Sequence, residues 1–100
     1  MSPEPFAITQ TGATVAAAGT FQTLLASNAN RKGGLIQNTG TGALQIVFGS
    51  GTAVAAAAIS LGAGGTIDLS LGVLTGVYQG EVQVAGALAA PVVTIEATRF

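Results

Sequence analysis

The sequence predicts an all-β protein, an antiparallel β-sandwich or a jelly-roll-like barrel of about seven to eight short strands. Short runs in which apolar and polar residues alternate recur along the chain, as in half-buried strands. Clusters of Gly, Asn, Thr and Ser separate these runs at spacings typical of an all-β fold. A chain of 100 residues suits a single domain. We assign residues 6–100 to this domain and residues 1–5 to an extended N-terminal arm.

The first strand is expected just after two prolines. Pro3 and Pro5 favour extended backbone, and Phe6 and Ile8 then begin a strand. Residues 1–5 are either a frayed tail or an arm that lies on a neighbouring subunit.

The first half of the domain predicts a strand and then a hairpin. The strand is Phe21–Ala26, and the turn residues SNANRKGG follow it. Leu35–Asn38 and Ala43–Phe48 are two further apolar runs, joined by the tight connection Thr39–Gly42. Two such runs separated by a short loop indicate a β-hairpin.

The second half predicts three more strands. Gly62–Gly65 forms a turn before Thr66–Leu69, in which Ile67 and Leu69 share one face. The run Val77–Val84 alternates at its end, and Pro91–Phe100 has the clearest period of two in the chain. Two-faced alternation of this kind favours antiparallel sheets.

A glycine-rich segment in the middle of the chain has an alternative interpretation as a dinucleotide-binding loop. Gly49 and Gly51 match the first two glycines of the Gly-x-Gly-x-x-Gly pattern, and Asp68 follows at a plausible distance. The third glycine position is Val54, whose side chain would obstruct close helix packing. We therefore interpret the segment as a turn. The alanine run after it is either a small-residue strand or a short helical turn near Ala53–Ala58.

The composition excludes several classes of function. Charged residues make up 7% of the chain, against about 25% in typical soluble domains. Cysteine and histidine are absent, which removes thiolate chemistry and the commonest general base. The longest apolar run, Ala53–Ile59, is far shorter than the roughly 18 residues of a membrane span. We expect no cofactor, no metal and no membrane association.

The acidic residues give weak signals for catalysis or metal binding. Glu81 and Glu96 are the candidate carboxylate pair for hydrolysis, but both lie on polar strand faces, where solvated side chains are the ordinary case. Asp68 alone supplies too few ligands for a metal. We expect no enzymatic activity.

Five residues are candidates for interaction with a partner. Arg31 and Lys32 form the only basic pair, which is too little charge for nucleic-acid binding. They are interpreted as a solvated turn or as a contact with an acidic partner surface. Tyr78 is either a cross-strand residue or a stacking platform for a sugar. The full set of candidates is Phe6, Ile8, Arg31, Lys32 and Tyr78.

About half of the chain resembles small virion proteins of tailed bacteriophages. The stretches that carry the likeness are Arg31–Gly42, with the letters RKGGLIQNTGTG, Leu44–Thr52, with LQIVFGSGT, and Ile59–Leu69, with ISLGAGGTIDL. The resemblance implies a non-enzymatic β-sandwich module in many copies on a capsid or tail. It carries over no functional residue.

These observations lead to one expected function and one alternative. The expected function is a multi-copy structural protein of a virion, a head-surface decoration or minor capsid component, located in the virion. We expect homo-oligomers and contact with a major capsid or other virion protein, because sheet edges without charges invite pairing with another chain. The alternative is a glycan-binding module of a tail fibre or tail tip.

Overall fold

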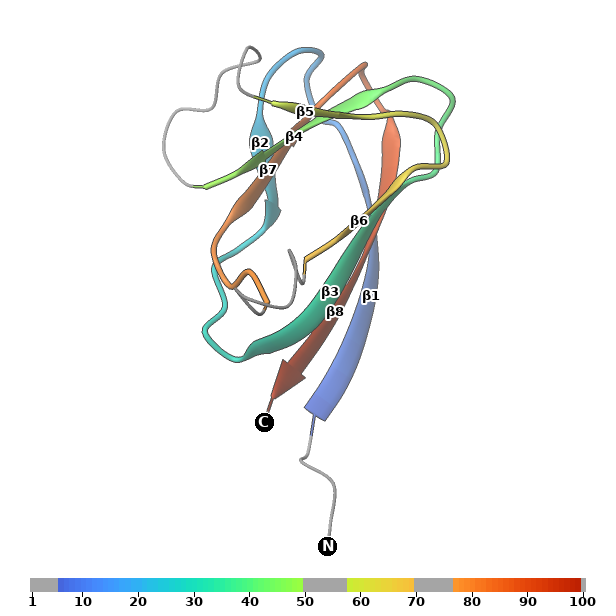
Figure 1. Cartoon of the computed structure of the whole chain (residues 1–100). Coiled ribbons are helices and arrows are strands. Elements are labelled where there is room, and N and C mark those ends of the chain that lie inside the picture. Colours follow the sequence, from blue (N-terminus) through green and yellow to red (C-terminus); the bar gives the residue numbers. More distant parts are fainter. Residues whose placement is uncertain (1–5, 50–57, 70–76, 100) are drawn as a thin grey trace, which may run out of the picture.

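The computed structural model describes residues 6–49, 58–69 and 77–99 and shows an all-β protein (Figure 1). These residues form eight strands and no helix. The strands are β1 (Phe6–Thr14), β2 (Gln22–Leu25), β3 (Arg31–Asn38), β4 (Leu44–Phe48), β5 (Ile59–Leu61), β6 (Thr66–Asp68), β7 (Val82–Ala85) and β8 (Pro91–Arg99). The predicted fold class and strand number are therefore confirmed.

Each strand of the first half of the chain pairs with a strand of the second half, as in a single long hairpin that folds back on itself. β1 pairs with β8, β2 with β7, β3 with β6 and β4 with β5, and every pair is antiparallel. Two further pairings, β3 with β8 and β4 with β7, join these pairs sideways. The result is two four-stranded sheets of order β1-β8-β3-β6 and β2-β7-β4-β5. This is the strand order of a jelly roll, which the sequence left undecided.

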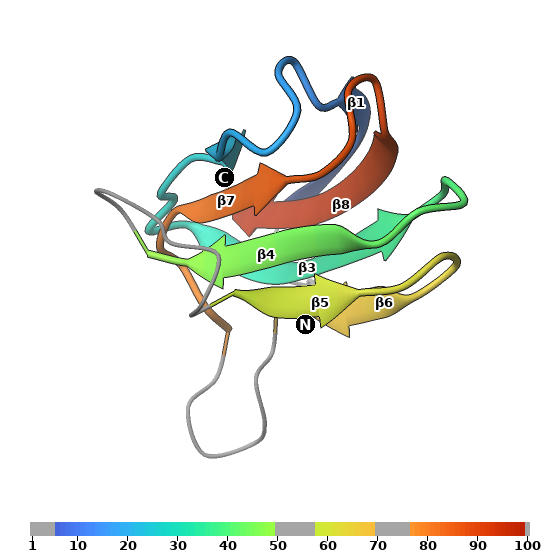
Figure 2. The same ribbon diagram turned by 90° about the horizontal axis from the view of Figure 1, so that it is seen from above.

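The two sheets form two layers with the core between them, as the view from above shows (Figure 2). The buried apolar residues come from both sheets and are Val15, Leu25, Ile36, Leu44, Ile46, Leu61, Leu69, Val82, Val84 and Val92. Packing of two inner faces is the usual way for a sandwich to remove apolar area from water.

The predicted hairpin between Leu35–Asn38 and Ala43–Phe48 is wrong. These segments belong to β3 and β4, which lie in different sheets. The connection between them carries the chain from one layer to the other. Its start is held by Asn38, whose side-chain amide donates to the Gly42 and Leu61 carbonyls at 2.7 and 2.9 Å. Alternation indicates which residues form strands, but it does not indicate which sheet a strand joins.

One further strand prediction is wrong, and two predictions concern residues that the structure does not describe. The predicted strand Val77–Val84 is too long, because only Val82–Ala85 forms β7. The residues before β7 bond instead to the region of Arg31, as described below. The predicted arm, residues 1–5, and residues 53–57 of the predicted helical turn lie outside the described residues. Ala58 is described and lies in neither a helix nor a strand.

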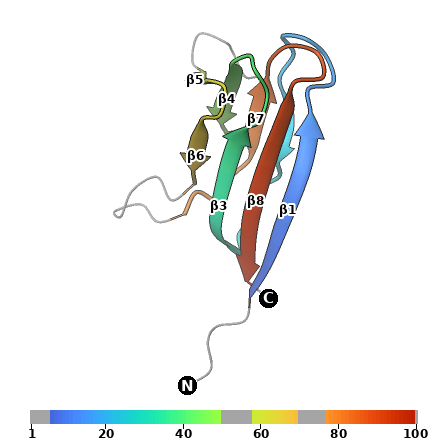
Figure 3. The same ribbon diagram turned by 90° about the vertical axis from the view of Figure 1, so that its right-hand side faces the viewer.

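The two sheets differ in length. β1 and β8 have nine residues each and β3 has eight, whereas the strands of the β2-β7-β4-β5 sheet have three to five. The long strands therefore extend beyond the shorter sheet at the end where β1 starts and β8 ends (Figure 3). On β1, residues 8–12 are exposed, so both alternating sets of side chains on this strand are accessible.

Candidate functional site

The buried charge of the molecule is concentrated at one corner, where β3 begins. The Arg31 side chain is completely buried. Its Nε donates to Glu96 Oε2 at 2.6 Å, and its terminal nitrogens donate to the carbonyls of Ala26, Tyr78 and Gly80 at 2.7 to 3.0 Å. The guanidinium thus ties together β8, the end of the β2 segment and the segment before β7. We call this group the Arg31 corner.

A β-bulge explains why Arg31 points inward. The pairing of β3 with β8 shifts between Arg31 and Gly33, so Lys32 is an extra residue in β3. The prediction of a solvated Arg31-Lys32 turn is therefore wrong for Arg31, whose side chain is not accessible to any partner. Lys32 is exposed.

Tyr78 is also engaged within the chain. Its ring packs edge-on against Phe48, with 5.1 Å between the ring centroids. Its hydroxyl donates to the Glu81 carbonyl at 2.9 Å. Neither the ring nor the hydroxyl is arranged as an open platform for a sugar, and the Tyr78 main chain serves the Arg31 corner.

The two candidate catalytic carboxylates serve different local contacts. Glu96 is ion-paired with Arg31, and Glu81 Oε2 accepts a hydrogen bond from the Thr23 hydroxyl at 2.7 Å. Among the residues that the structure describes, no group of three His, Cys, Asp or Glu residues is placed to hold a metal ion. The described part of the chain also contains no helix of the length and apolarity that a membrane crossing requires.

The strand that contains Phe6 and Ile8 is the most open element of the fold. β1 pairs with β8 over nine consecutive residues without a register shift, and within the described residues no strand pairs with its other edge (Figure 3). Residues 8–12 are all exposed, so the strand faces water on both sides of the sheet as well. β1 contains no charged residue and no proline, the features that usually protect an edge.

The other edges of the two sheets present much less free backbone. β5 and β6 have three residues each, and β2 has four and contains a register shift. Short and irregular edges offer fewer main-chain hydrogen bonds than the nine-residue edge of β1. β1 is therefore the candidate interaction element of the described chain.

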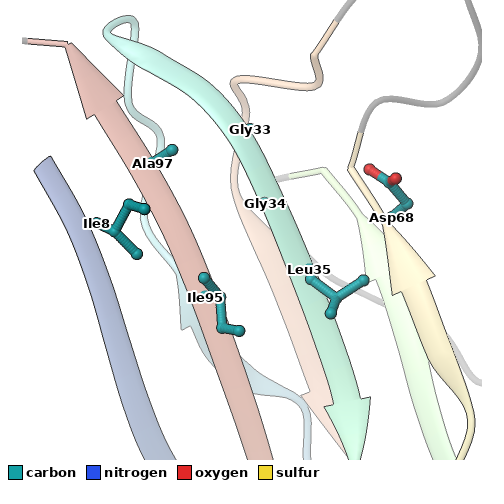
Figure 4. Close-up of a pocket in the computed structure, with 7 residues that line it drawn as sticks. All are labelled: Ile8, Gly33, Gly34, Leu35, Asp68, Ile95 and Ala97. Carbon is teal, nitrogen blue, oxygen red and sulfur yellow. The ribbon is translucent and has the colours of Figure 1, made fainter. Parts of the chain in front are cut away.

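The outer face of the β1-β8-β3-β6 sheet contains a shallow apolar hollow of about 360 Å³. Its lining is Ile8, Gly33, Gly34, Leu35, Asp68, Ile95 and Ala97 (Figure 4). Gly33 adds no side chain to the hollow, and Ile8 is 65% exposed at its β1 side. We call this feature the glycine hollow.

Asn38 is a central residue that was not predicted from the sequence. Its side chain is fully buried, and its Oδ1 accepts the Gly40 N–H at 2.9 Å while its amide donates twice, as given above. The signal is present in the letters NTG, because an Asn side chain often bonds to the backbone two residues further on. The Leu61 carbonyl, which accepts the second hydrogen bond from the amide, belongs to β5 in the other sheet. Nothing in the sequence around Asn38 indicates this contact.

Comparison with known proteins gives one structural likeness. No protein-family model matches the sequence, and no curated protein matches it. One match is a chain of the solved structure "Bacillus endospore appendages form a novel family of disulfide-linked pili", with a TM-score of 0.53 and 21% sequence identity. The alignment covers 99% of this chain and 92% of that chain. A likeness at this identity shows that the two chains share a β-sandwich fold.

Proposed function

We propose that this protein is a structural subunit that assembles with copies of itself through the free edge of β1. The observation that carries the proposal is the exposure of this strand on three sides: its outer face, its inner face and its unpaired edge. The proposal assigns no catalytic activity to the chain.

The energetics of β1 favour a partner. Ordering the backbone costs about 1–2 kcal/mol per residue, and residues 8–12 of β1 are exposed, whereas Ala13 packs partly buried against the core. Pairing with β8 is therefore the main interaction that offsets the cost of ordering the exposed part of this strand. A second strand on the open edge would supply a further ladder of hydrogen bonds, and main-chain pairing of this kind is a common mode of association.

The structural likeness supports a filament at a cell surface as the kind of assembly. The matched chain comes from appendages that are described as disulfide-linked pili. The present sequence contains no cysteine, so its 100 residues carry no disulfide link. In this chain, strand pairing and packing would have to hold the subunits together.

A bacteriophage capsid decoration is the more specific form of the same idea. It rests on the resemblance over Arg31–Leu69, and the comparisons add nothing to it. Both assemblies would use the same edge and differ in the particle with which the chain co-purifies. The glycan-binding alternative has less support, because Tyr78 is occupied within the chain.

Charging the edge of β1 tests the proposal. The double variant Thr9→Lys/Thr11→Lys places two lysines on exposed β1 positions, whereas Thr41→Lys/Ala63→Lys adds the same charge at exposed turn positions. We expect the parent and the turn variant to form long assemblies in electron micrographs and fast-sedimenting species. The β1 variant should be folded and should form no long assemblies.

A parent chain that stays monomeric at millimolar concentration would overturn the proposal. So would assemblies that the β1 lysines leave intact. Circular dichroism of each variant confirms that the sandwich is folded in every comparison.

A further inference from the structure

Three cross-strand rows run over the outer face of the β1-β8-β3-β6 sheet, each with β8 in the middle. The pairing registers give them as Ile8–Ala97–Gly33, Gln10–Ile95–Leu35 and Gly12–Val93–Gln37. Directly opposite residues in an antiparallel sheet point to the same face, and Figure 4 shows Ile8, Ala97, Ile95 and Leu35 on one side of the sheet.

Two of these rows combine a large and a small residue in opposite order. In the first row the large residue, Ile8, is on β1 and the glycine, Gly33, is on β3. In the third row the glycine, Gly12, is on β1 and the larger Gln37 is on β3. A surface with this arrangement is complementary to a second copy of itself that is rotated by 180° about an axis parallel to β8.

We propose that a second copy of this chain packs face to face on this sheet, related by a two-fold axis parallel to β8. Each Ile8 then enters the glycine hollow of the other copy above Gly33, and each Gln37 lies above the other copy's Gly12. The residues of β8 meet their own equivalents at the centre. The inference deepens the proposed function and rests on it only for the repetition of this contact along an assembly.

The charge distribution suits such a contact. The nine residues of the three rows are uncharged. Asp68 lies on β6, beyond β3, so in this arrangement it falls outside the other copy's β1 and its carboxylate stays at the rim in water. The contact therefore buries apolar and amide groups without desolvating a carboxylate, which is costly.

The area of the proposed face-to-face contact is too small to hold a single pair of copies together stably. Three strands of about nine residues cover roughly 30 by 14 Å, or roughly 400 Å² for each copy. The total of roughly 800 Å² is below the size of stable interfaces, about 1,200 Å² or more. One pair is thus a weak dimer, and many pairs along an edge-paired row add up through multivalency. The expected assembly has two layers.

Cross-linking at the centre of the interface is the first test. Ala97→Cys places the only thiol of the chain near the two-fold axis, and Ser60→Cys places it on β5 in the other sheet. Stacked sheets lie about 10 Å apart, beyond the roughly 7 Å reach of a disulfide, so a short bismaleimide is used. We expect Ala97→Cys to yield cross-linked dimer at least tenfold faster. Equal rates would overturn the proposal.

Exchanging the large and small residues is the second test, made in the Ala97→Cys chain. An added Cβ at Gly33 would lie 3.9 Å from Ala97 Cβ, an ordinary contact, so the isolated subunit has room for the first atom of a valine side chain. The rate at which each variant reacts with a monofunctional maleimide shows whether the valine of Gly33→Val shields the thiol of Ala97→Cys within one subunit. It should lower the cross-linking rate at least tenfold, and adding Ile8→Ala should restore it. Ser60→Val is the matched control. A rate that Gly33→Val leaves unchanged, or that the exchange fails to restore, would overturn the proposal.

Two further measurements separate the face-to-face contact from effects on folding and on edge pairing. If Gly33→Val lowers the melting temperature, Gly12→Leu blocks the other end of the interface, because its added Cβ meets no atom within 4 Å. Repeating the cross-linking with Thr9→Lys/Thr11→Lys present removes edge pairing. Dimers that persist there support the face contact whether or not rows form, whereas rows without cross-linking support only the proposed function.

Discussion

Strand β3 has an inner and an outer face that differ in how completely this chain satisfies them. On the inner face, Arg31 donates to four acceptors, Ile36 is fully buried and Asn38 makes three side-chain hydrogen bonds. On the outer face, Gly33 and Leu35 line an open hollow. The Arg31 and Asn38 side chains are committed internally, whereas the outer-face positions Gly33, Leu35 and Gln37 are uncharged.

This difference explains the unusual composition of the chain. A monomer normally uses charges to keep its edges and faces apart from other molecules. Here one of the three cations, Arg31, closes a corner together with Glu96. Arg31 and Glu96 thus stabilise the subunit, and the proposed contacts between subunits would cover β1 and the outer face. Substitutions on the two faces of β3 should separate these roles.

Removing the Arg31 side chain should have the largest effect on stability. Arg31→Ala leaves Glu96 and three main-chain carbonyls without their donor. Breaking a buried ion pair typically costs about 3–5 kcal/mol, so we expect a loss of that size in the free energy of unfolding by urea. Lys32→Ala is the neighbouring control and should change it by less than about 1 kcal/mol. Similar losses for both variants would contradict the assignment of the corner.

The Arg31 corner also shows where prediction from sequence stops. Several strand positions follow from alternation, and the predicted strand Pro91–Phe100 agrees with β8 to within one residue. The burial of Arg31 does not follow, because a bulge reverses the alternation at Lys32 and the partners of the guanidinium are 5 to 65 residues away along the chain. An Arg-Lys pair beside two glycines indicates a solvated turn when it is considered locally.

Asn38 should give the second largest effect. Asn38→Asp has the same shape, but it replaces a donor with an acceptor that faces the Gly42 and Leu61 carbonyls. Since each unsatisfied buried group costs about 1–3 kcal/mol, we expect a loss of about 3 kcal/mol in the free energy of unfolding. Asn38→Ala should lose less, because it buries no charge. A loss for Asn38→Asp no larger than that for Asn38→Ala would contradict the placement of the amide nitrogen against these two carbonyls.

Gly34 should give an intermediate effect. A Cβ at this position would lie 2.5 Å from Leu69 Cδ1, and Leu69 is fully buried. Overpacking of a core typically costs about 1–3 kcal/mol, so Gly34→Ala should lower the free energy of unfolding by that amount. Combining it with Leu69→Ala, which makes room, should recover part of the added loss. A loss for the pair equal to the sum of the single losses would argue against this contact.

Gly33, which precedes Gly34 in β3, should give the smallest effect on stability. Its added Cβ would meet only Ala97 Cβ, at 3.9 Å. Glycine in a strand is less favourable than alanine by roughly 0.5–1 kcal/mol, so Gly33→Ala should leave the free energy of unfolding unchanged or raise it by up to about 1 kcal/mol. Both alanine variants are made in the Thr9→Lys/Thr11→Lys chain, because association through β1 would otherwise contribute to the measured stability. A loss at Gly33 as large as that at Gly34 would mean that both faces of β3 are closed within one subunit, and no face would be left for a second copy.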